Sequence, residues 1–250
     1  MSLHEKLKLL FRAWKYRLRV ERAEIAFLRQ HLRTGQTCAD VGAHKGAFTY
    51  WMQKQVGHQG KVYAFEPQPE LAAYLARVKQ GFGMEQVTVV HAAVSNRAGT
   101  SRLFRERSST PSATLSEVGA DSSASVEVPL ETLDGYFSRP GRRPVDFIKC
   151  DVEGHELEAF QGAEAILTED RPKLLFECEQ RHLHGHSMRD VFEYLAGLGY
   201  QGWFFRRGEL VPLEQFVPES NAAPGEPDYV YNFAFFPGDR PPSGQGSEPP

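Results

Sequence analysis

A short apolar segment that breaks into a glycine-containing turn is the feature that most constrains the fold. Residues 37–41 read Thr-Cys-Ala-Asp-Val, glycines follow at Gly42 and Gly46, and residues 46–56 continue as a helix-like run. A glycine turn between a strand and a helix lets a ligand approach the backbone, because no Cβ atom blocks the way. The pattern predicts the first strand and a ligand-binding turn of an α/β domain.

A second apolar strand is expected at residues 61–66, and it ends on Glu66. Glu66 lies 24 residues after Gly42, close to the place where a βαβ unit positions an acid beside a bound ribose. The two oxygens of a carboxylate can accept hydrogen bonds from both hydroxyls of a ribose diol. We therefore expect a cofactor that contains a nucleoside.

The glycine spacing indicates which cofactor this is. Dinucleotide sites use G-x-G-x-x-G, whereas residues 40–46 read Asp-Val-Gly-Ala-His-Lys-Gly. Asp40, just before the turn, would repel a pyrophosphate and attract a cation. S-adenosylmethionine carries a sulfonium and an ammonium group, and its adenosine supplies the diol. The pattern favours S-adenosylmethionine over NAD, although such a turn also occurs in purely structural roles.

The rest of the chain alternates between predicted strands and helices. Apolar strands separated by helices are typical of a doubly wound α/β domain, in which a mostly parallel sheet is covered on both faces. Residues 100–104 and 125–130 interrupt the alternation as a predicted hairpin, with a polar loop at 108–124 that we expect to be a flap over the active site. Strands are expected at 37–41, 61–66, 87–91, 145–151, 173–179, 200–205 and 229–236, and helices at 46–56, 69–80, 155–168 and 187–197.

The chain is expected to divide into three parts. Residues 1–36 are predicted to form a basic amphipathic helix, and residues 37–236 the α/β domain with the hairpin inserted at 100–130. Residues 237–250, rich in Pro, Gly and Ser, are predicted to be a disordered tail. A further Pro-rich stretch at 218–227 is expected to be a surface loop.

The N-terminal segment is strongly basic. Residues 1–33 contain nine Lys or Arg and three Glu, a charge of +6, which leaves −9 for the remainder of a chain whose net charge is −3. Such a helix can contact a membrane surface or a phosphate-bearing acceptor, or it can pack on the domain with a solvated basic face. No motif for nucleic-acid binding occurs, so we expect no nucleic-acid partner. The oligomeric state is not indicated.

Composition favours a cytoplasmic location. No apolar run approaches the roughly 20 residues needed to cross a bilayer, and the first ten residues do not resemble a signal peptide. The three cysteines, Cys38, Cys150 and Cys178, are widely spaced and fall in predicted strands. We expect them to be small apolar residues of the core rather than disulfides, zinc ligands or redox centres.

A second chemical cluster follows the predicted strand at 145–151. The strand ends on Asp151, Glu153 and His155 lie in the turn, and a helix begins near Glu156. In a doubly wound sheet this strand lies beside the first, so Asp151 is expected to face Asp40 and the glycine turn. Acids at the start of a helix also cap free amides, and this is the better interpretation for Glu156 and Glu158.

Six collinear segments between residues 37 and 180 carry a resemblance to a known family. They are Asp-Val-Gly-Ala-His-Lys-Gly (40–46), Val-Tyr-Ala-Phe-Glu-Pro (62–67), His-Ala-Ala-Val-Ser-Asn-Arg-Ala-Gly (91–99), Thr-Leu-Asp (132–134), Asp-Phe-Ile-Lys-Cys-Asp-Val-Glu-Gly-His-Glu-Leu (146–157) and Leu-Leu-Phe-Glu (174–177). Together they resemble the FkbM family of S-adenosylmethionine-dependent methyltransferases. The resemblance implies a seven-stranded class I methyltransferase fold whose last strand is antiparallel, and methyl transfer to a hydroxyl group.

The resemblance also implies roles for individual residues. Asp40 and Gly42 would belong to the first cofactor motif, and Asp151 would lie beside the methyl group. The family more often has asparagine where this chain has His44, and asparagine tolerates positive φ better than histidine does. The expected cofactor site comprises Asp40, Gly42, Ala43, His44, Gly46, Glu66 at the ribose, Pro67, and Ala92 and Ala93 near the adenine.

A hydroxyl nucleophile must lose its proton, which requires a general base, a metal ion or both. Asp151 and His155 are the first candidates for the base, followed by Glu153, although His155 could equally be a solvent-facing residue at the start of a helix. Asp151, Glu153 and Glu177 have the oxygen ligands that magnesium prefers. Separate roles for these carboxylates are more plausible, and no metal is assigned.

Three alternate histidines, His182, His184 and His186, suggest a metal site. The competing interpretation begins from Ser187 and Asp190, a pair typical of a helix start, which makes the histidines the loop before that helix. This loop follows the fifth predicted strand, so it is expected to border the active site and contact the acceptor. We favour this structural or acceptor-contacting role over zinc binding.

The expected function is O-methylation of a sugar, glycolipid or small natural product, with S-adenosylmethionine as the methyl donor. One alternative is an NAD-dependent oxidoreductase, against which the glycine spacing and Asp40 argue. The other is a non-catalytic methyltransferase-like domain that binds partners through its basic N-terminal helix.

Overall fold

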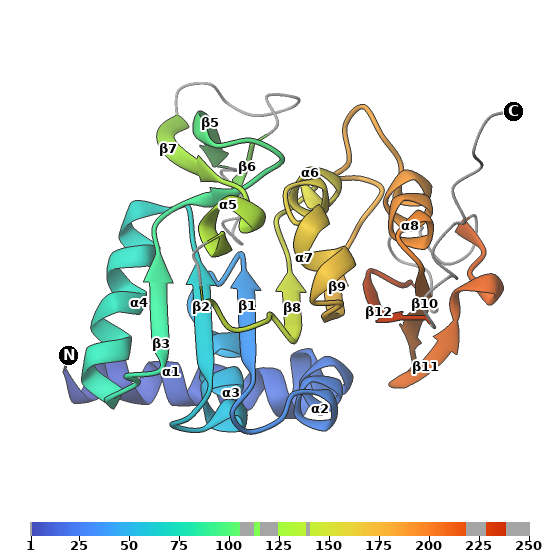
Figure 1. Cartoon of the computed structure of the whole chain (residues 1–250). Helices are drawn as coiled ribbons and strands as arrows, with labels where there is room; N and C mark the ends of the chain where they lie inside the picture. Colours follow the sequence, from blue (N-terminus) through green and yellow to red (C-terminus); the bar gives the residue numbers. More distant parts are fainter. Residues whose placement is uncertain (1, 106–112, 116–124, 139–140, 219–228, 239–250) are drawn as a thin grey trace, which may run out of the picture.

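The computed structural model describes residues 2–105, 113–115, 125–138, 141–218 and 229–238. Its centre is an eight-stranded sheet flanked by helices, and a four-stranded sheet lies beside one end of it (Figure 1). Most of the predicted loop at 108–124, of the loop at 218–227 and of the tail at 237–250 lies outside the described residues.

The large sheet has the strand order β11-β10-β12-β9-β8-β1-β2-β3. Its central strand β1 pairs in parallel with both β2 and β8, so the chain builds outward from β1 in two directions. Ligands of doubly wound sheets bind where the strand order reverses, outside the carboxyl ends of the strands. The strands are β1 (Thr37–Val41), β2 (Lys61–Phe65), β3 (Val87–Val90), β8 (Phe147–Cys150), β9 (Lys173–Glu177), β10 (Tyr200–Arg206), β11 (Glu209–Pro212) and β12 (Asn232–Pro237).

The last strand, β12, runs antiparallel to both of its neighbours, β9 and β10, as the family resemblance implies. The prediction of seven strands missed the edge strand β11. It pairs antiparallel with β10 across a two-residue turn, Arg207 and Gly208, whose φ angles are +51° and +88°. Positive φ at both central residues is the geometry of the tightest hairpins, and an Arg-Gly pair signals it less clearly than Asn-Gly.

Helices cover both faces of this sheet, each over its own apolar core. Buried residues of α5 to α8 pack on one face, with Phe65, Ile148 and Phe176 from the strands. Buried residues of α1 to α4 pack on the other, with Val62 and Phe147. The helices are α1 (Leu3–Lys15), α2 (Arg22–His31), α3 (Ala47–Val56), α4 (Pro69–Phe82), α5 (Leu133–Phe137), α6 (Glu156–Gln161), α7 (Glu164–Glu169) and α8 (Met188–Gly197).

The helix predicted at 155–168 is two short helices, α6 and α7, broken at Gly162. A Cβ atom on Gly162 would lie 1.9 Å from the main-chain oxygen of Ser95, so the chain that follows strand β4 (Ala93–Val94) packs directly against the break. The helix predicted at 187–197 is confirmed. Ser187 and Asp190 form a reciprocal capping box at its start.

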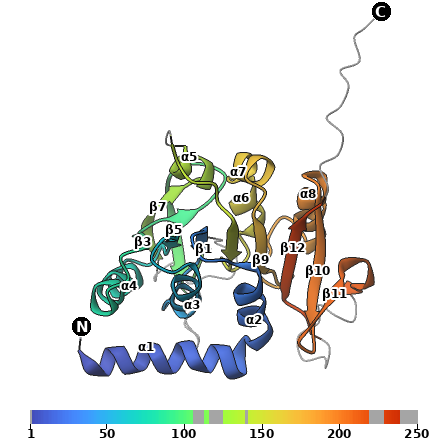
Figure 2. The same cartoon turned by 60° about the horizontal axis from the view of Figure 1, so that its bottom comes forward.

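The N-terminal segment forms two helices rather than one. Between α1 and α2 lies a π-helical turn, η1 (Tyr16–Val20). Helix α1 lies across the outside of α3 and reaches α4, as Figure 2 shows. The indole Nε1 of Trp51 in α3 donates a hydrogen bond of 2.9 Å to the carbonyl of Ala13, which fixes α1 to the domain.

The predicted hairpin forms part of the four-stranded sheet, which has the order β4-β7-β5-β6. Strands β5 and β7 pair antiparallel from Gly99 to Phe104. Ala93, Leu103, Val128 and Leu130 make a small core of its own. The strands are β4 (Ala93–Val94), β5 (Gly99–Arg105), β6 (Ala113–Thr114) and β7 (Ser125–Glu131).

The three cysteines are buried and free, as predicted. Cys38 lies in β1 and Cys150 in β8, whereas Cys178 directly follows β9. Among the described residues, no helix combines the length and the apolar character needed to cross a membrane.

Candidate functional site

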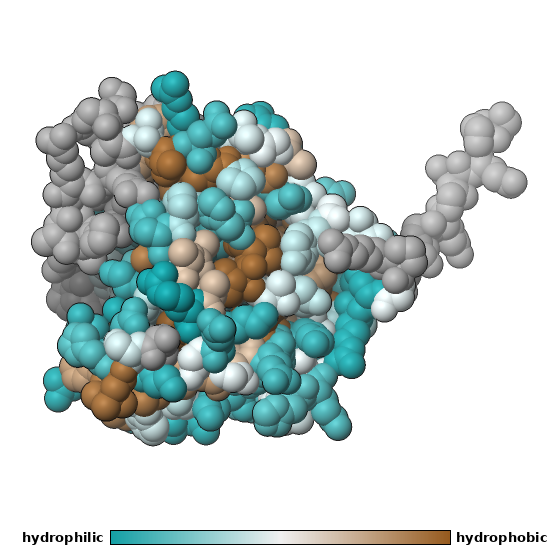
Figure 3. Space-filling model, turned by 90° about the vertical axis from the view of Figure 1, so that its left-hand side faces the viewer, coloured by the Kyte–Doolittle hydropathy of each residue, from teal (hydrophilic) through white to brown (hydrophobic). Residues whose placement is uncertain are grey.

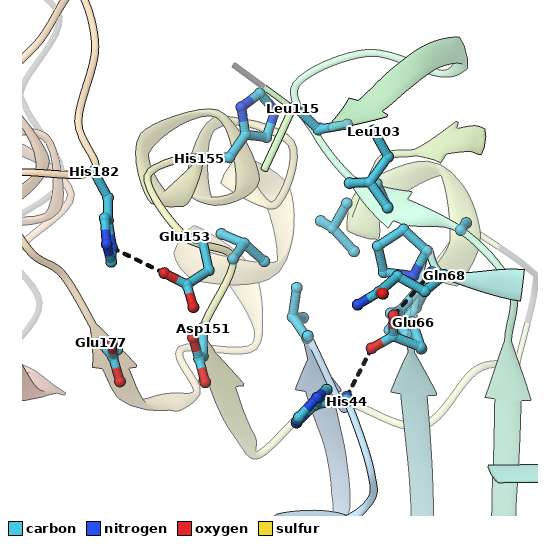
Figure 4. A pocket seen from close by; sticks show the side chains of 18 of the residues that line it. His44, Glu66, Gln68, Leu103, Leu115, Asp151, Glu153, His155, Glu177 and His182 are labelled. Atoms are coloured by element: carbon cyan, nitrogen blue, oxygen red, sulfur yellow. Dashed lines mark hydrogen bonds and ion pairs between the residues drawn. The ribbon is translucent and has the colours of Figure 1, made fainter. Parts of the chain in front are cut away.

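A cavity of about 490 Å³ opens at the carboxyl ends of β1, β2 and β8 (Figure 4). It lies at the reversal of strand order, where doubly wound domains bind ligands. Its walls come from four regions: the η1 turn, the loops after the central strands, the small sheet and the loop after β9. They are lined by Tyr16, Glu21, Val41, Gly42, His44, Phe65, Glu66, Pro67, Gln68, Ala92, Ala93, Val94, Leu103, Leu115, Asp151, Val152, Glu153, His155, Glu177, Glu179, Arg181 and His182.

The turn after β1 has the left-handed backbone that its glycines predict. Gly42, His44 and Gly46 have φ angles of +76°, +47° and +75°. A Cβ atom on Gly42 would lie 1.8 Å from the main-chain oxygen of Asp151, so glycine is required there by packing as well as by conformation. His44 adopts the left-handed region despite being a histidine, and its buried Nε2 has no hydrogen-bond partner in the described structure.

Glu66 directly follows β2 and is held by the backbone on both of its oxygens. The amide of His44 donates to Oε2 at 2.7 Å and the amide of Gln68 donates to Oε1 at 2.8 Å. Burial raises the pKa of Glu66 to about 7, although both backbone hydrogen bonds act to lower it. The side chain is therefore fixed at the cavity wall, and each oxygen keeps a lone pair that can accept from a ligand hydroxyl.

A buried lysine connects the two central strands. Lys149 Nζ lies 3.1 Å from Asp151 Oδ2, 3.3 Å from the carbonyl of Gly42 and 3.9 Å from Asp40 Oδ1. Burial acts to lower the pKa of Lys149, but the charges of Asp151, Asp40 and Glu21 outweigh it and raise that pKa. The ammonium group therefore stays charged and holds the turn after β1 against the end of β8.

One end of the cavity is rich in carboxylates. Glu153 lies 2.9 Å from His182 Nδ1, and Glu177 and Asp151 lie on the same side of the view in Figure 4. Burial, followed by the charges of Asp151 and Glu153, raises the pKa of Glu177. The hydrogen bond to Glu153 raises the pKa of His182. This end therefore brings together ionisable side chains whose charges influence one another, an arrangement that is common in functional sites.

His155 lies apart from these carboxylates. Figure 4 shows it near Leu115, at the opposite edge of the cavity from Glu177. Its Nε2 is 2.9 Å from Ser95 Oγ, and its Nδ1 is 3.5 Å from Glu158 Oε2. Burial lowers the pKa of His155. The structure therefore brings Asp151 and Glu153 together but separates His155 from them.

The opposite wall is mainly apolar. The predicted residues Pro67, Ala92 and Ala93 line it, and so do Leu103 and Leu115 from the region of the small sheet. An apolar slot beside an acid with two accepting oxygens is the environment that an adenosine group requires.

Three predicted cofactor residues do not line the cavity. Asp40 is fully buried and accepts a hydrogen bond of 2.5 Å from Thr49 Oγ1. Ala43 belongs to the core on the α3 face, and Gly46 caps the start of α3. Asp40 is connected to the site through its ion pair with Lys149, at 3.9 Å.

Sequence reasoning missed Tyr16, Glu21, Gln68 and Lys149. The sequence does mark Lys149 as unusual, because it is a charged residue inside an otherwise apolar strand. Nothing in the sequence marks Tyr16 and Glu21 as site residues, because the packing of η1 brings them to the cavity. Burial raises the pKa of Glu21 to about 8.

The three histidines of the run at 182–186 do not come together at one site. His182 lines the cavity, whereas His184 is exposed and His186 is half-buried. In the part of the chain that the structure describes, no group of three or more His, Cys, Asp or Glu side chains is arranged to hold a metal ion.

Solved structures show the same fold at low sequence identity. Methyltransferase FkbM from Methylobacillus flagellatus KT has a TM-score of 0.53 and 14% identity, over 94% of this chain and 56% of its own. An rRNA methylase from Streptococcus thermophilus has a TM-score of 0.50 and 16% identity, over 86% and 94% of the two chains. A precorrin-6y C5,15-methyltransferase from Geobacter metallireducens GS-15 has a TM-score of 0.50 and 13% identity, over 87% and 86%.

This chain thus spans a little over half the length of the Methylobacillus protein. No curated protein matches the sequence. The model of the methyltransferase FkbM domain family matches residues 40–201, which include the glycine turn, Glu66 and the end of β8. The chain therefore belongs to the FkbM family of S-adenosylmethionine-dependent methyltransferases.

Proposed function

We propose that this methyltransferase transfers the methyl group of S-adenosylmethionine to a hydroxyl group of a sugar, a glycolipid or a small natural product. The observation that carries the proposal is the placement of Asp151 across the cavity from Glu66 (Figure 4). The carboxylate of Glu66 is held in place to accept hydrogen bonds from a ribose, and Asp151 lies at the carboxylate-rich end.

In this proposal Glu66 accepts hydrogen bonds from the two ribose hydroxyls, while the amides of His44 and Gln68 keep its carboxylate in place. Ala92 and Ala93 border the adenine, and the glycine turn borders the methionine part. When bound, S-adenosylmethionine would supply an electrophilic methyl group and two positive charges. The carboxylates around Asp151 complement those charges.

The acceptor is proposed to enter from the carboxylate-rich end. A hydroxyl group must lose its proton as it attacks, and a base within hydrogen-bond reach can take it. Asp151, held by Lys149, is our first candidate for this role. Glu153, paired with His182, is the second, and His155 is the weakest candidate because it lies near Leu115 at the other edge.

The charge of the cavity argues against a nucleic-acid acceptor, although one neighbour of similar fold is an rRNA methylase. Arg181 donates two hydrogen bonds to Glu179, and His182 pairs with Glu153 at 2.9 Å. Among the described residues that line this end, the positive charges are therefore already neutralised by carboxylates, and a phosphate backbone would gain little there. An acceptor without phosphate groups is favoured instead.

The test is methyl transfer from isotopically labelled S-adenosylmethionine to panels of sugars, glycolipids and natural-product alcohols. We expect a product heavier by one methyl group, on oxygen, and production of S-adenosylhomocysteine. Asp151→Asn should still bind S-adenosylhomocysteine while losing most of its turnover, because it keeps the shape but not the proton acceptor. Label found only on nitrogen, carbon or RNA would contradict the proposal. Cofactor binding without transfer to any acceptor would favour the non-catalytic alternative.

A further inference from the structure

An apolar stripe remains exposed along the N-terminal segment. Leu3, Leu7, Phe11, Trp14 and Leu18 are 73%, 55%, 73%, 44% and 61% exposed. Their spacing of four, four, three and four residues places them on one face of a helix. In Figure 3 a brown patch lies at the lower left of this face of the molecule, in the region where α1 begins in Figure 1.

Within the described ranges, only one member of this stripe packs on the domain: the indole of Trp14 lies edge-on to that of Trp51, with ring centroids 5.3 Å apart. Leu9 and Ala13, on the other side of α1, are fully buried. Trp51 holds the carbonyl of Ala13, and Arg12 Nη1 donates to the carbonyl of Lys45 at 3.4 Å. The helix therefore cannot turn its apolar stripe inward without breaking these contacts.

A basic flank runs beside the stripe. Lys8, Lys15 and Arg19 are exposed, and their positions follow the stripe on one side of the helix. They belong to the segment of residues 1–33 whose charge is +6. Helix α1 therefore presents three faces: one buried in the domain, one apolar and exposed, and one basic.

We propose that the exposed face of α1 and η1 binds the surface of an anionic lipid bilayer. Interfacial helices place leucine and aromatic side chains at the boundary of the acyl chains, while lysine and arginine contact anionic headgroups. A second copy of the chain fits less well, because a symmetric contact would bring two segments of charge +6 together. RNA would use the basic flank but leave the apolar stripe exposed.

This binding extends the proposed function without depending on it. Tyr16 and Glu21, which flank the last residues of the stripe, line the cavity. Docking of the stripe therefore brings the cavity close to the lipid surface, where an acceptor carried by a lipid would be presented.

The test is co-sedimentation of the full chain with vesicles of phosphatidylcholine, alone or with about 30 mol % phosphatidylglycerol. We expect binding to the anionic vesicles only. The triple variant Leu7→Gln, Phe11→Gln, Leu18→Gln should bind at least about tenfold more weakly, because the apolar contact is lost. Lys8→Glu, Lys15→Glu, Arg19→Glu should also release the protein. The matched control is Leu210→Gln, Val217→Gln, which changes two exposed apolar residues elsewhere and should bind as the parent does.

All variants should keep the thermal unfolding midpoint and the S-adenosylhomocysteine affinity of the parent, so a failure here is distinguishable from a failure of the proposed function. The proposal is overturned if the parent protein ignores anionic vesicles, or if the triple variant binds them equally well. It is also overturned if the parent protein binds no vesicles but is a dimer that the triple variant converts to a monomer. Binding of the parent protein to RNA but not to vesicles would overturn it as well.

Discussion

The end of β8 packs directly on the turn after β1: a Cβ atom on Gly42 would lie 1.8 Å from the main-chain oxygen of Asp151. Backbone contact at this point positions the two halves of the cavity relative to each other. The sequence pattern predicts this glycine as a place where a ligand approaches the backbone. In the structure, a neighbouring strand end occupies that approach, and the cavity lies beside it.

Gly42→Ala should therefore lower the free energy of unfolding by more than the cost of placing alanine in a left-handed backbone, because the new Cβ atom would also collide with Asp151. Gly83 is the matched control, because its φ is +62° and no atom of the described residues lies within 4 Å of where its Cβ would be. Gly83→Ala should cost about 1–2 kcal/mol from the left-handed backbone. Gly42→Ala should cost at least about 2 kcal/mol more, because Asp151 must move. Denaturant unfolding measures both, and equal losses would refute the packing argument.

The Lys149 cluster gives a second prediction. Lys149→Met removes the ammonium between Asp40 and Asp151 and leaves a buried carboxylate at Asp40 without its charge partner. Breaking a buried ion pair in this way costs about 3–5 kcal/mol. Adding Asp40→Asn should restore part of the lost free energy of unfolding, because the unpaired charge is removed. A double variant no more stable than Lys149→Met would show that Asp40 and Lys149 are not coupled.

Glu156 predicts how stability depends on pH. The side chain is 1% exposed, its Oε1 accepts from the amide of Gly154 at 3.0 Å, and burial raises its pKa to about 8 from an ordinary 4.5. Between these two values the folded state binds the proton that the unfolded state releases, so this group lowers stability as the pH rises from about 4.5 to 8.

Glu156→Gln should abolish that decline. The variant should gain stability over the parent as the pH rises, reaching a few kcal/mol near pH 9, on the order of the full linkage term. Urea unfolding from pH 5 to pH 9 follows the difference. Glu85→Gln, at an exposed position, is the control and should track the parent throughout. A difference independent of pH would mean that Glu156 is not protonated in the folded protein.

Glu66→Gln should weaken S-adenosylhomocysteine binding while the protein stays folded. In the variant, the side-chain NH2 group would face one of the two backbone amides that now donate to the carboxylate. The ribose would also lose a charged acceptor. Together these two losses should weaken binding about 10- to 100-fold. Because the pKa of Glu66 is about 7, the affinity of the parent should rise from pH 6 to pH 8. The pH dependence should be flatter in the variant when both are titrated calorimetrically.

The sequence was informative where chemistry follows chain order. The glycine turn, Glu66 and Asp151 each follow a strand, and parallel strands bring their carboxyl ends together, so the pattern predicted their meeting. The Thr-Leu-Asp segment at 132–134 resembles the family, but the sequence did not indicate what it does. In the structure Thr132 caps α5, and Asp134 accepts from the amides of Ala165 and Ile166 at the start of α7.

The sequence was less informative where position depends on packing between distant segments. The amphipathic pattern at the N-terminus indicated helix, but the π-helical turn that brings Tyr16 and Glu21 to the cavity follows from how α1 and α2 pack on α3. The separation of His155 from Asp151 was likewise not predictable from a spacing of four residues, because it depends on where α6 begins.

The most direct measurement is a crystal structure of the protein with S-adenosylhomocysteine. We expect both ribose hydroxyls to donate to Glu66, while the amides of His44 and Gln68 still donate to its oxygens. We also expect the sulfur to lie on the Asp151 side of the Gly42 turn. A ribose bound away from Glu66, or a nucleoside placed at the carboxylate-rich end, would contradict these expectations.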